Sequence, residues 1–133
     1  MAFWTVDVGD RLLSLKLVGS FTVAEMNAFV AAHNAGVDSF NGTEYRVFCN
    51  IRELRALPPA CGLLMESAKA YSASQPGFQG SAVYVANKIV AVQHQKTSVT
   101  GGVMNTELIS DDEMELRLHL DTVRRTPATP TSE

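Results

Sequence analysis

The sequence predicts an α/β domain with a mostly parallel, five-stranded sheet, and three observations support this prediction. Segments with strand-like patterns alternate with helix-like ones in the order β-β-α-β-α-β-α-β-α, as expected when helices connect parallel strands. Only a tight turn separates the first two strands, so the first must be an antiparallel edge strand. The inner strands alternate apolar and polar residues, which predicts helices mainly on one face of the sheet.

The N-terminal part predicts a hairpin followed by a helix with a clear start signal. Two strand-like segments, Phe3–Val8 and Arg11–Val18, are separated by residues that favour a turn. Thr22 precedes a helical pattern and Glu25 follows three residues later, so together they form a predicted capping box. We expect this helix to end near Gly36, because glycine often terminates helices.

The middle of the chain predicts two more strands and two more helices. Tyr45–Ile51 is strand-like, and two prolines then lead into a helix predicted at Ala60–Ser72. A proline is tolerated there because the first turn of a helix lacks partners for its N–H groups. Ser81–Ala86 is the next predicted strand, and Asn87 is the predicted cap of a short helix.

The C-terminal part predicts a loop, a last strand and a last helix. We expect a mobile loop at Thr97–Gly102 and a strand at Val103–Ile109. Ser110 and Glu113 form a second predicted capping box, at the start of a helix that runs to about Arg124.

Length and composition predict a single domain in the cytoplasm. Residues 1–125 form one predicted domain, and residues 126–133 are a predicted disordered tail because they are polar and rich in proline. The net charge of −3 argues against a nucleic-acid partner. Membrane insertion is not expected, because no apolar run approaches the ~20 residues that cross a bilayer. Cys49 and Cys61 lie in apolar sequence and are predicted to be buried, reduced thiols.

No cofactor, metal site or catalytic machinery is predicted. His33, His94 and His119 fall in separate elements and lack the spacing of metal ligands. Cys61 lies near a helix start, where the helix dipole favours a thiolate, but no histidine is placed to activate it. The sequence therefore predicts a protein that is not an enzyme.

The polar side of the sheet and the last helix offer surfaces for a partner. If the helices cover one face, the other face exposes Leu12, Ser14, Lys16, Arg46, Phe48 and Tyr84. Met114 and Leu118 form a second apolar line on the last helix. Phe48, Tyr84, Met114 and Leu118 are thus a candidate surface for a homodimer or another partner. An ordinary half-polar sheet face and a broad core-facing helix stripe are the alternatives.

Four segments carry a family resemblance over roughly residues 3 to 122. They are Leu17-Val18-Gly19-Ser20-Phe21-Thr22, Val47-Phe48-Cys49-Asn50-Ile51-Arg52, Val83-Tyr84-Val85-Ala86-Asn87 with Val92-Gln93, and Ser110-Asp111-Asp112-Glu113. In this order the chain resembles STAS domains and their SpoIIAA-like relatives. The resemblance implies a SpoIIAA-like fold and a regulatory binding module, such as an anti-sigma factor antagonist. In that family a kinase phosphorylates a serine in an Asp-Ser-Ser-Gly motif at the start of the second helix.

The corresponding segment here is Pro59-Ala60-Cys61-Gly62, which has no hydroxyl group to accept a phosphate. The resemblance therefore implies a protein-interaction module without the phosphoacceptor serine, which binds a regulatory protein. The expected contact residues are Asn50, Arg52, Glu53, Pro59, Ala60, Cys61 and Gly62. Two alternatives remain open. One is a domain that binds a small apolar or lipid-like ligand in a cavity of a few hundred Å³. The other is a thiol-based redox protein that uses Cys61.

Overall fold

The computed structural model describes residues 2–103 and 105–125, so the predicted tail at residues 126–133 lies outside it. The described residues form five strands and four helices in the predicted order. The strands are β1 (Phe3–Val8), β2 (Leu12–Gly19), β3 (Tyr45–Leu54), β4 (Phe78–Tyr84) and β5 (Glu107–Ser110). The helices are α1 (Val23–Asp38), α2 (Pro59–Ser74), α3 (Lys88–Gly101) and α4 (Glu113–Arg125).

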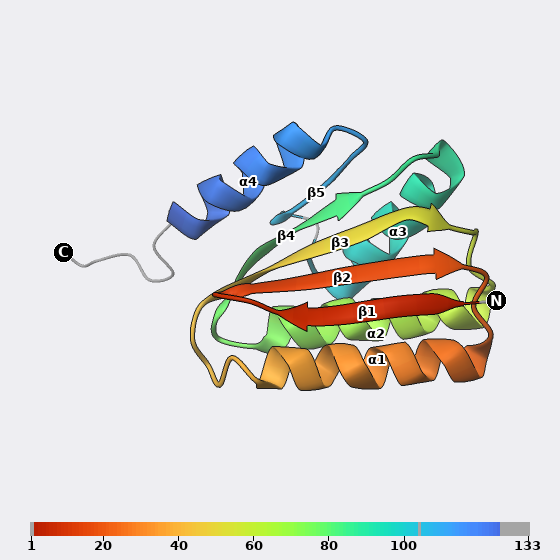
Figure 1. The fold of residues 1–133 in the computed structure, drawn as a ribbon, viewed down its shortest axis with the longest axis horizontal. Helices are drawn as coiled ribbons and strands as arrows, with labels where there is room; N and C mark the ends of the chain where they lie inside the picture. The colour runs from red at the N-terminus through yellow and green to blue at the C-terminus, as the bar shows by residue number, and fades with distance from the viewer. Residues whose placement is uncertain (1, 104, 126–133) are drawn as a thin grey trace.

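The sheet follows the chain, with the strand order β1-β2-β3-β4-β5. β1 pairs with β2 antiparallel, and the other neighbouring strands are parallel, so the predicted mixed sheet with an antiparallel N-terminal edge is confirmed. Figure 1 shows α4 set apart from the other three helices, beside β4 and β5. No described helix combines the length and hydrophobicity needed to span a bilayer.

The main core lies between the sheet and helices α1, α2 and α3. Leu13, Leu15 and Leu17 of β2 all point into it, as their alternation predicts. Met26 and Phe29 of α1 are fully buried against the same face. Burial of large apolar side chains at about 25 cal/mol per Å² is the main force that holds these layers together.

Helix α4 packs on the opposite face and corrects the predicted exposure of that face. Leu116 and Leu120 form a second small core with Phe48 and Ala82. Phe48 and Arg46, which the alternation predicts to be exposed, each keep only 6% of their surface accessible. The strand pattern alone does not indicate that Phe48 and Arg46 are buried. One short helix is enough to cover the β3–β4 part of the face.

Helix α1 begins as predicted but continues past its expected end. Thr22 Oγ1 accepts from Glu25 N at 3.1 Å, and Glu25 Oε1 accepts from Thr22 N at 2.9 Å, so the capping box is confirmed. Gly36 lies inside the helix, where an added Cβ would come within 2.8 Å of Leu13 Cδ1. The glycine therefore allows close packing of α1 on β2 and does not end the helix.

The segment predicted as a mobile loop at Thr97–Gly102 is mostly the last part of α3. The helix ends at Gly102, whose left-handed φ of +81° suits glycine. β5 is accordingly shorter than predicted. The second predicted capping box is replaced by Asp112, whose Oδ1 accepts from Met114 N at 3.0 Å.

Candidate functional site

The start of α2 has no side-chain cap. Pro58 stands at the N-cap and Pro59 follows, so no side chain accepts from the first helical N–H groups. The loop before the helix is held by Gln93 of α3, whose Oε1 accepts from Leu57 N at 2.9 Å and whose Nε2 donates to Leu57 O at 3.1 Å. This amide clamp fixes the helix start against α3.

An open groove lies between the first turn of α2, the preceding loop and α3. Its volume is about 250 Å³, and it is lined by Leu57, Pro58, Pro59, Gly62, Leu63, Glu66, Gln93, Lys96 and Thr97. We call it the α2-start groove. Leu63 remains 65% exposed beside it. An added Cβ on Gly62 would meet no atom within 4 Å, so this glycine opens onto free space.

Cys61, expected at the contact surface, points into the protein. Its side chain is fully buried, and its Sγ donates to Phe21 O at 3.6 Å. Burial raises the pKa of the Cys61 thiol, and the nearby Glu25 carboxylate acts in the same direction. The site therefore disfavours the thiolate that nucleophilic or redox chemistry needs. Both cysteines are free and buried, as predicted.

Asn50, Arg52 and Tyr84 come together on the face of the sheet that carries α4. Asn50 Oδ1 accepts from the backbone N of Arg52 at 3.2 Å and from its Nε at 3.3 Å. The Arg52 guanidinium then lies 4.3 Å from the centre of the Tyr84 ring. Ile51, which lies between Asn50 and Arg52 in β3, packs into the main core with α2. Asn50 and Arg52 therefore lie on the opposite side of the sheet from Pro59, Ala60 and Gly62, and Glu53 is exposed.

The candidate dimer or partner surface divides in two. Phe48 is buried beneath Arg117, whose guanidinium lies 4.2 Å from its ring centre, and Tyr84 is half-buried next to it. Met114 and Leu118 remain 73% and 61% exposed. They lie on the opposite side of α4 from Leu116, which is fully buried. The four residues do not form one continuous surface.

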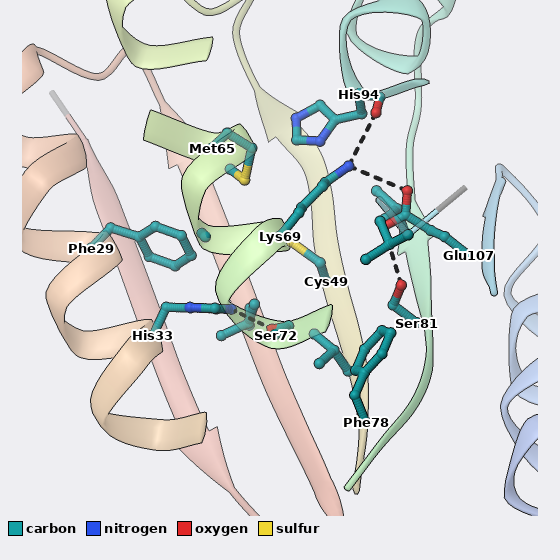
Figure 2. Close-up of a pocket in the computed structure, with 15 residues that line it drawn as sticks. Phe29, His33, Cys49, Met65, Lys69, Ser72, Phe78, Ser81, His94 and Glu107 are labelled. Carbon is teal, nitrogen blue, oxygen red and sulfur yellow. Dashed lines mark hydrogen bonds and ion pairs between the residues drawn. The ribbon is translucent and has the colours of Figure 1, made fainter. Parts of the chain in front are cut away.

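A buried polar cluster, which the sequence analysis does not single out, joins α2, α3 and the sheet (Figure 2). Lys69 Nζ lies 3.2 Å from Glu107 Oε1, and the two side chains are only 10% and 4% exposed. Lys69 also donates to His94 O at 3.0 Å and to Ser98 Oγ at 2.7 Å. Glu107 accepts in addition from Ser98 and from Ser81. Burial lowers the pKa of Lys69, and the Glu107 carboxylate opposes this.

His94 borders this cluster with two unpaired ring nitrogens. The residue is 1% exposed, and neither Nδ1 nor Nε2 has a hydrogen-bond partner among the described residues. Burial first, and then the Lys69 charge, lower the pKa of His94 to about 3, so the ring is neutral at pH 7. Cys49 lies in the same region, and burial raises the pKa of its thiol to about 12.

A small internal cavity of about 40 Å³ lies between the sheet and the helices at this cluster. Lys69, Cys49 and His94 line one part of it, and His33 and Ser72 line another. The His33 Nε2 and Ser72 Oγ are 3.1 Å apart and share a hydrogen bond. Since a water molecule needs roughly 10–15 Å³, a cavity of about 40 Å³ has room for about three water molecules.

Sequence patterns missed this cluster because each residue has an ordinary exposed interpretation. Lys69 lies in a helix between small residues, His94 in a polar run, and Glu107 in a short strand. Only the packing of α3 against both α2 and β5 brings them together. A weak signal is present in α3, whose polar residues recur with helical spacing at His94, Thr97 and Ser98.

The described residues hold no cluster of three or more His, Cys, Asp or Glu side chains that could bind a metal ion. No family model and no curated protein matches this chain. The functional assignment therefore depends on the geometry of the described residues.

Proposed function

We propose that this chain is a non-enzymatic, STAS-like protein-interaction module that binds a regulatory protein at the α2-start groove. The observation that carries the proposal is the groove itself, an open volume of about 250 Å³ beside a helix start without a side-chain cap. It lies at the segment where the resembled family carries its phosphorylated serine. Because Ala60 and Cys61 stand there, we expect binding that does not depend on phosphorylation at this segment.

The groove has complementary features for a segment of another protein. The positive end of the α2 dipole beside the groove favours a carbonyl or carboxylate oxygen. Exposed Leu63 and the two prolines supply apolar contact area next to this polar point. An apolar patch bordered by polar groups is typical of protein-interaction sites.

The two alternative functions have less support from the geometry. A lipid-like ligand needs a cavity of several hundred Å³, and the internal cavity at the buried polar cluster has only about 40 Å³. A redox role needs an accessible thiolate, whereas Cys61 is fully buried with a raised pKa.

A glycine position provides a sharp test of the groove. Gly62→Gln places a long side chain in the groove, while Gly62→Ala adds only a methyl group with no atom within 4 Å. The wild-type chain, the two variants and a Leu118→Gln control on α4 are each used in affinity purification from the source cells, with quantitative mass spectrometry. We expect at least a tenfold loss of a specific partner with Gly62→Gln only.

Circular dichroism spectra and thermal unfolding of all four chains show whether the fold is intact. The proposal is wrong if the same partner is recovered in equal amounts with Gly62→Gln, or if Leu118→Gln abolishes recovery while Gly62→Gln does not.

A further inference from the structure

Helix α3 carries three of its large apolar residues on the outside. Ile89, Val92 and Val99 are 69%, 55% and 59% exposed. Its buried side contains Val90 together with the polar residues His94, Thr97 and Ser98. In a helix at a free surface the apolar side normally faces the core. Three exposed large apolar side chains on the outer side of one helix are typical of a surface that binds another molecule.

The edge of the sheet beside α3 has free backbone groups. β5 is the last strand in the sheet, and no described segment pairs with its outer side. The carbonyl of Thr106 accepts from Ser81 N of β4, and the carbonyl of Ser110 accepts from Val85 N just after β4, each at 3.0 Å. Because backbone groups alternate in direction along a strand, Glu107 and Ile109 present their N–H and C=O groups to the outer edge.

An open groove runs along this edge between α3 and β5. Two adjoining hollows of about 470 and 490 Å³ share Val92, Gln95 and Ile109 in their walls. We call the two together the β5-edge groove. It therefore combines exposed apolar side chains with unpaired strand backbone, the two features by which an extended peptide is recognised.

We propose that the β5-edge groove binds an extended, acidic and apolar segment of a partner protein, which adds to the sheet as a sixth strand beside β5. Apolar side chains of the segment contact Val92, Val99 and Ile109. Its acidic side chains lie near Lys88 and Lys96. This surface differs from the one that carries the proposed function, although Lys96 borders both grooves.

Charge decides between this occupant and a second copy of the chain. Lys88 and Lys96 line the groove, and neither forms an ion pair with another described residue. α3 itself contains no acidic residue, and the Glu107 carboxylate in the groove wall is paired with Lys69. Asp111, at the Ser110 end, is the exposed carboxylate in the wall, so the two lysines outnumber it and the wall is net positive. Antiparallel pairing of two β5 edges around a twofold axis would bring two such net-positive walls together. An acidic segment neutralises these charges instead.

The probes are two synthetic peptides of about ten residues, long enough to form a strand. Both have valine and isoleucine at alternating positions, with glutamate between them in one peptide and lysine in the other. Fluorescence anisotropy measures their binding to the full chain. We expect the glutamate peptide to bind at least tenfold more tightly, and its binding to slow the hydrogen exchange of the Glu107 and Ile109 amides.

Matched variants locate the binding. Val92→Glu and Lys88→Glu should each weaken the glutamate peptide at least fivefold, whereas Gly62→Gln in the α2-start groove should leave it within twofold. Ile109→Pro removes the outward N–H as well as the side chain, and Ile109→Ala removes the side chain only. We therefore expect a further loss of at least fivefold for the proline variant relative to the alanine variant.

Four outcomes would overturn the proposal. In the first, the glutamate peptide shows no saturable binding at millimolar concentration, and in the second both peptides bind equally. In the third, the glutamate peptide has the same affinity for the Ile109→Pro and Ile109→Ala variants. In the fourth, sedimentation shows a stable dimer of the chain that Val92→Glu dissociates. The last outcome would assign the edge to a second copy. Loss of binding in Gly62→Gln alone would move the peptide to the α2-start groove.

Discussion

The buried ion pair between Lys69 and Glu107 offers a quantitative test of the structure. Across 3.2 Å the two charges attract each other by about 5 kcal/mol at an effective dielectric constant of about 20. Removal from water costs each ion several kcal/mol, so the pair as a whole adds little to the free energy of unfolding. Removing one partner, however, leaves an uncompensated charge in the core.

We expect Glu107→Gln and Lys69→Met each to lower the free energy of unfolding by about 3–5 kcal/mol. In Glu107→Gln the lysine keeps His94 O, Ser98 Oγ and a neutral amide oxygen as acceptors, but it loses its negative counter-charge. In Lys69→Met the carboxylate keeps only the hydroxyl groups of Ser98 and Ser81 as donors. The double variant contains neither charge, and we expect it to be at least about 2 kcal/mol more stable than the sum of the single effects predicts.

Urea unfolding followed by circular dichroism measures all four chains at pH 7. The pH dependence gives an independent check. In Glu107→Gln the largest effect that opposes burial is removed, so the pKa of Lys69 falls further below its ordinary value. A folded-state pKa below the unfolded one means that stability rises as the pH increases towards 10, and we expect a steeper rise than in the wild type. Additive single effects, within about 0.5 kcal/mol, would refute the buried pair.

Three further predictions concern a histidine, two glycines and the two cysteines. His94 has a pKa of about 3 in the folded state and near 6.5 in the unfolded state. Its contribution to the free energy of unfolding is therefore complete above pH 6.5 and is lost as the pH falls towards 3. The free energy of unfolding, measured as the pH is lowered, should show a loss of up to about 5 kcal/mol that is absent in His94→Leu. In thermal unfolding, Gly62→Ala should stabilise the protein by about 0.5–1 kcal/mol, because the added methyl group lies in open space on a helix. Gly77→Ala should destabilise the protein by more than about 2 kcal/mol, because its Cβ would lie 2.1 Å from Thr43 O. Equal effects of the two substitutions would contradict the open surroundings of Gly62 and the crowded surroundings of Gly77. Cys49 and Cys61 should not react with a thiol reagent at pH 8 until the chain unfolds, and rapid labelling of either in the folded state would contradict their burial.

Local sequence patterns were sufficient to predict the structure where each residue has one dominant role. Alternation places Leu13, Leu15 and Leu17 in the core, because side chains along a strand point to opposite faces. The Thr22–Glu25 capping box needs only neighbouring residues, so the start of α1 follows directly from the sequence. These signals also predict the element order and the mixed sheet.

Prediction failed where a residue's role depends on a distant part of the chain. Thr97 and Ser98 look like loop residues, yet Ser98 belongs to a buried cluster with Lys69 and Glu107. Gly36 resembles a helix end, but it is required by the close approach of Leu13. Of the expected contact residues, Cys61 turns inward, and the sequence could not indicate which side of α2 would face the sheet.

The sequence by itself determined the alternation of strands and helices, the hairpin edge and the apolar face of β2, because hydrophobic periodicity and capping act over a few neighbouring residues. The tertiary structure decided which face α4 covers, which polar groups meet in the core, and which apolar residues of α3 remain outside. These depend on contacts between segments that are far apart in the chain, whose energies local patterns do not contain.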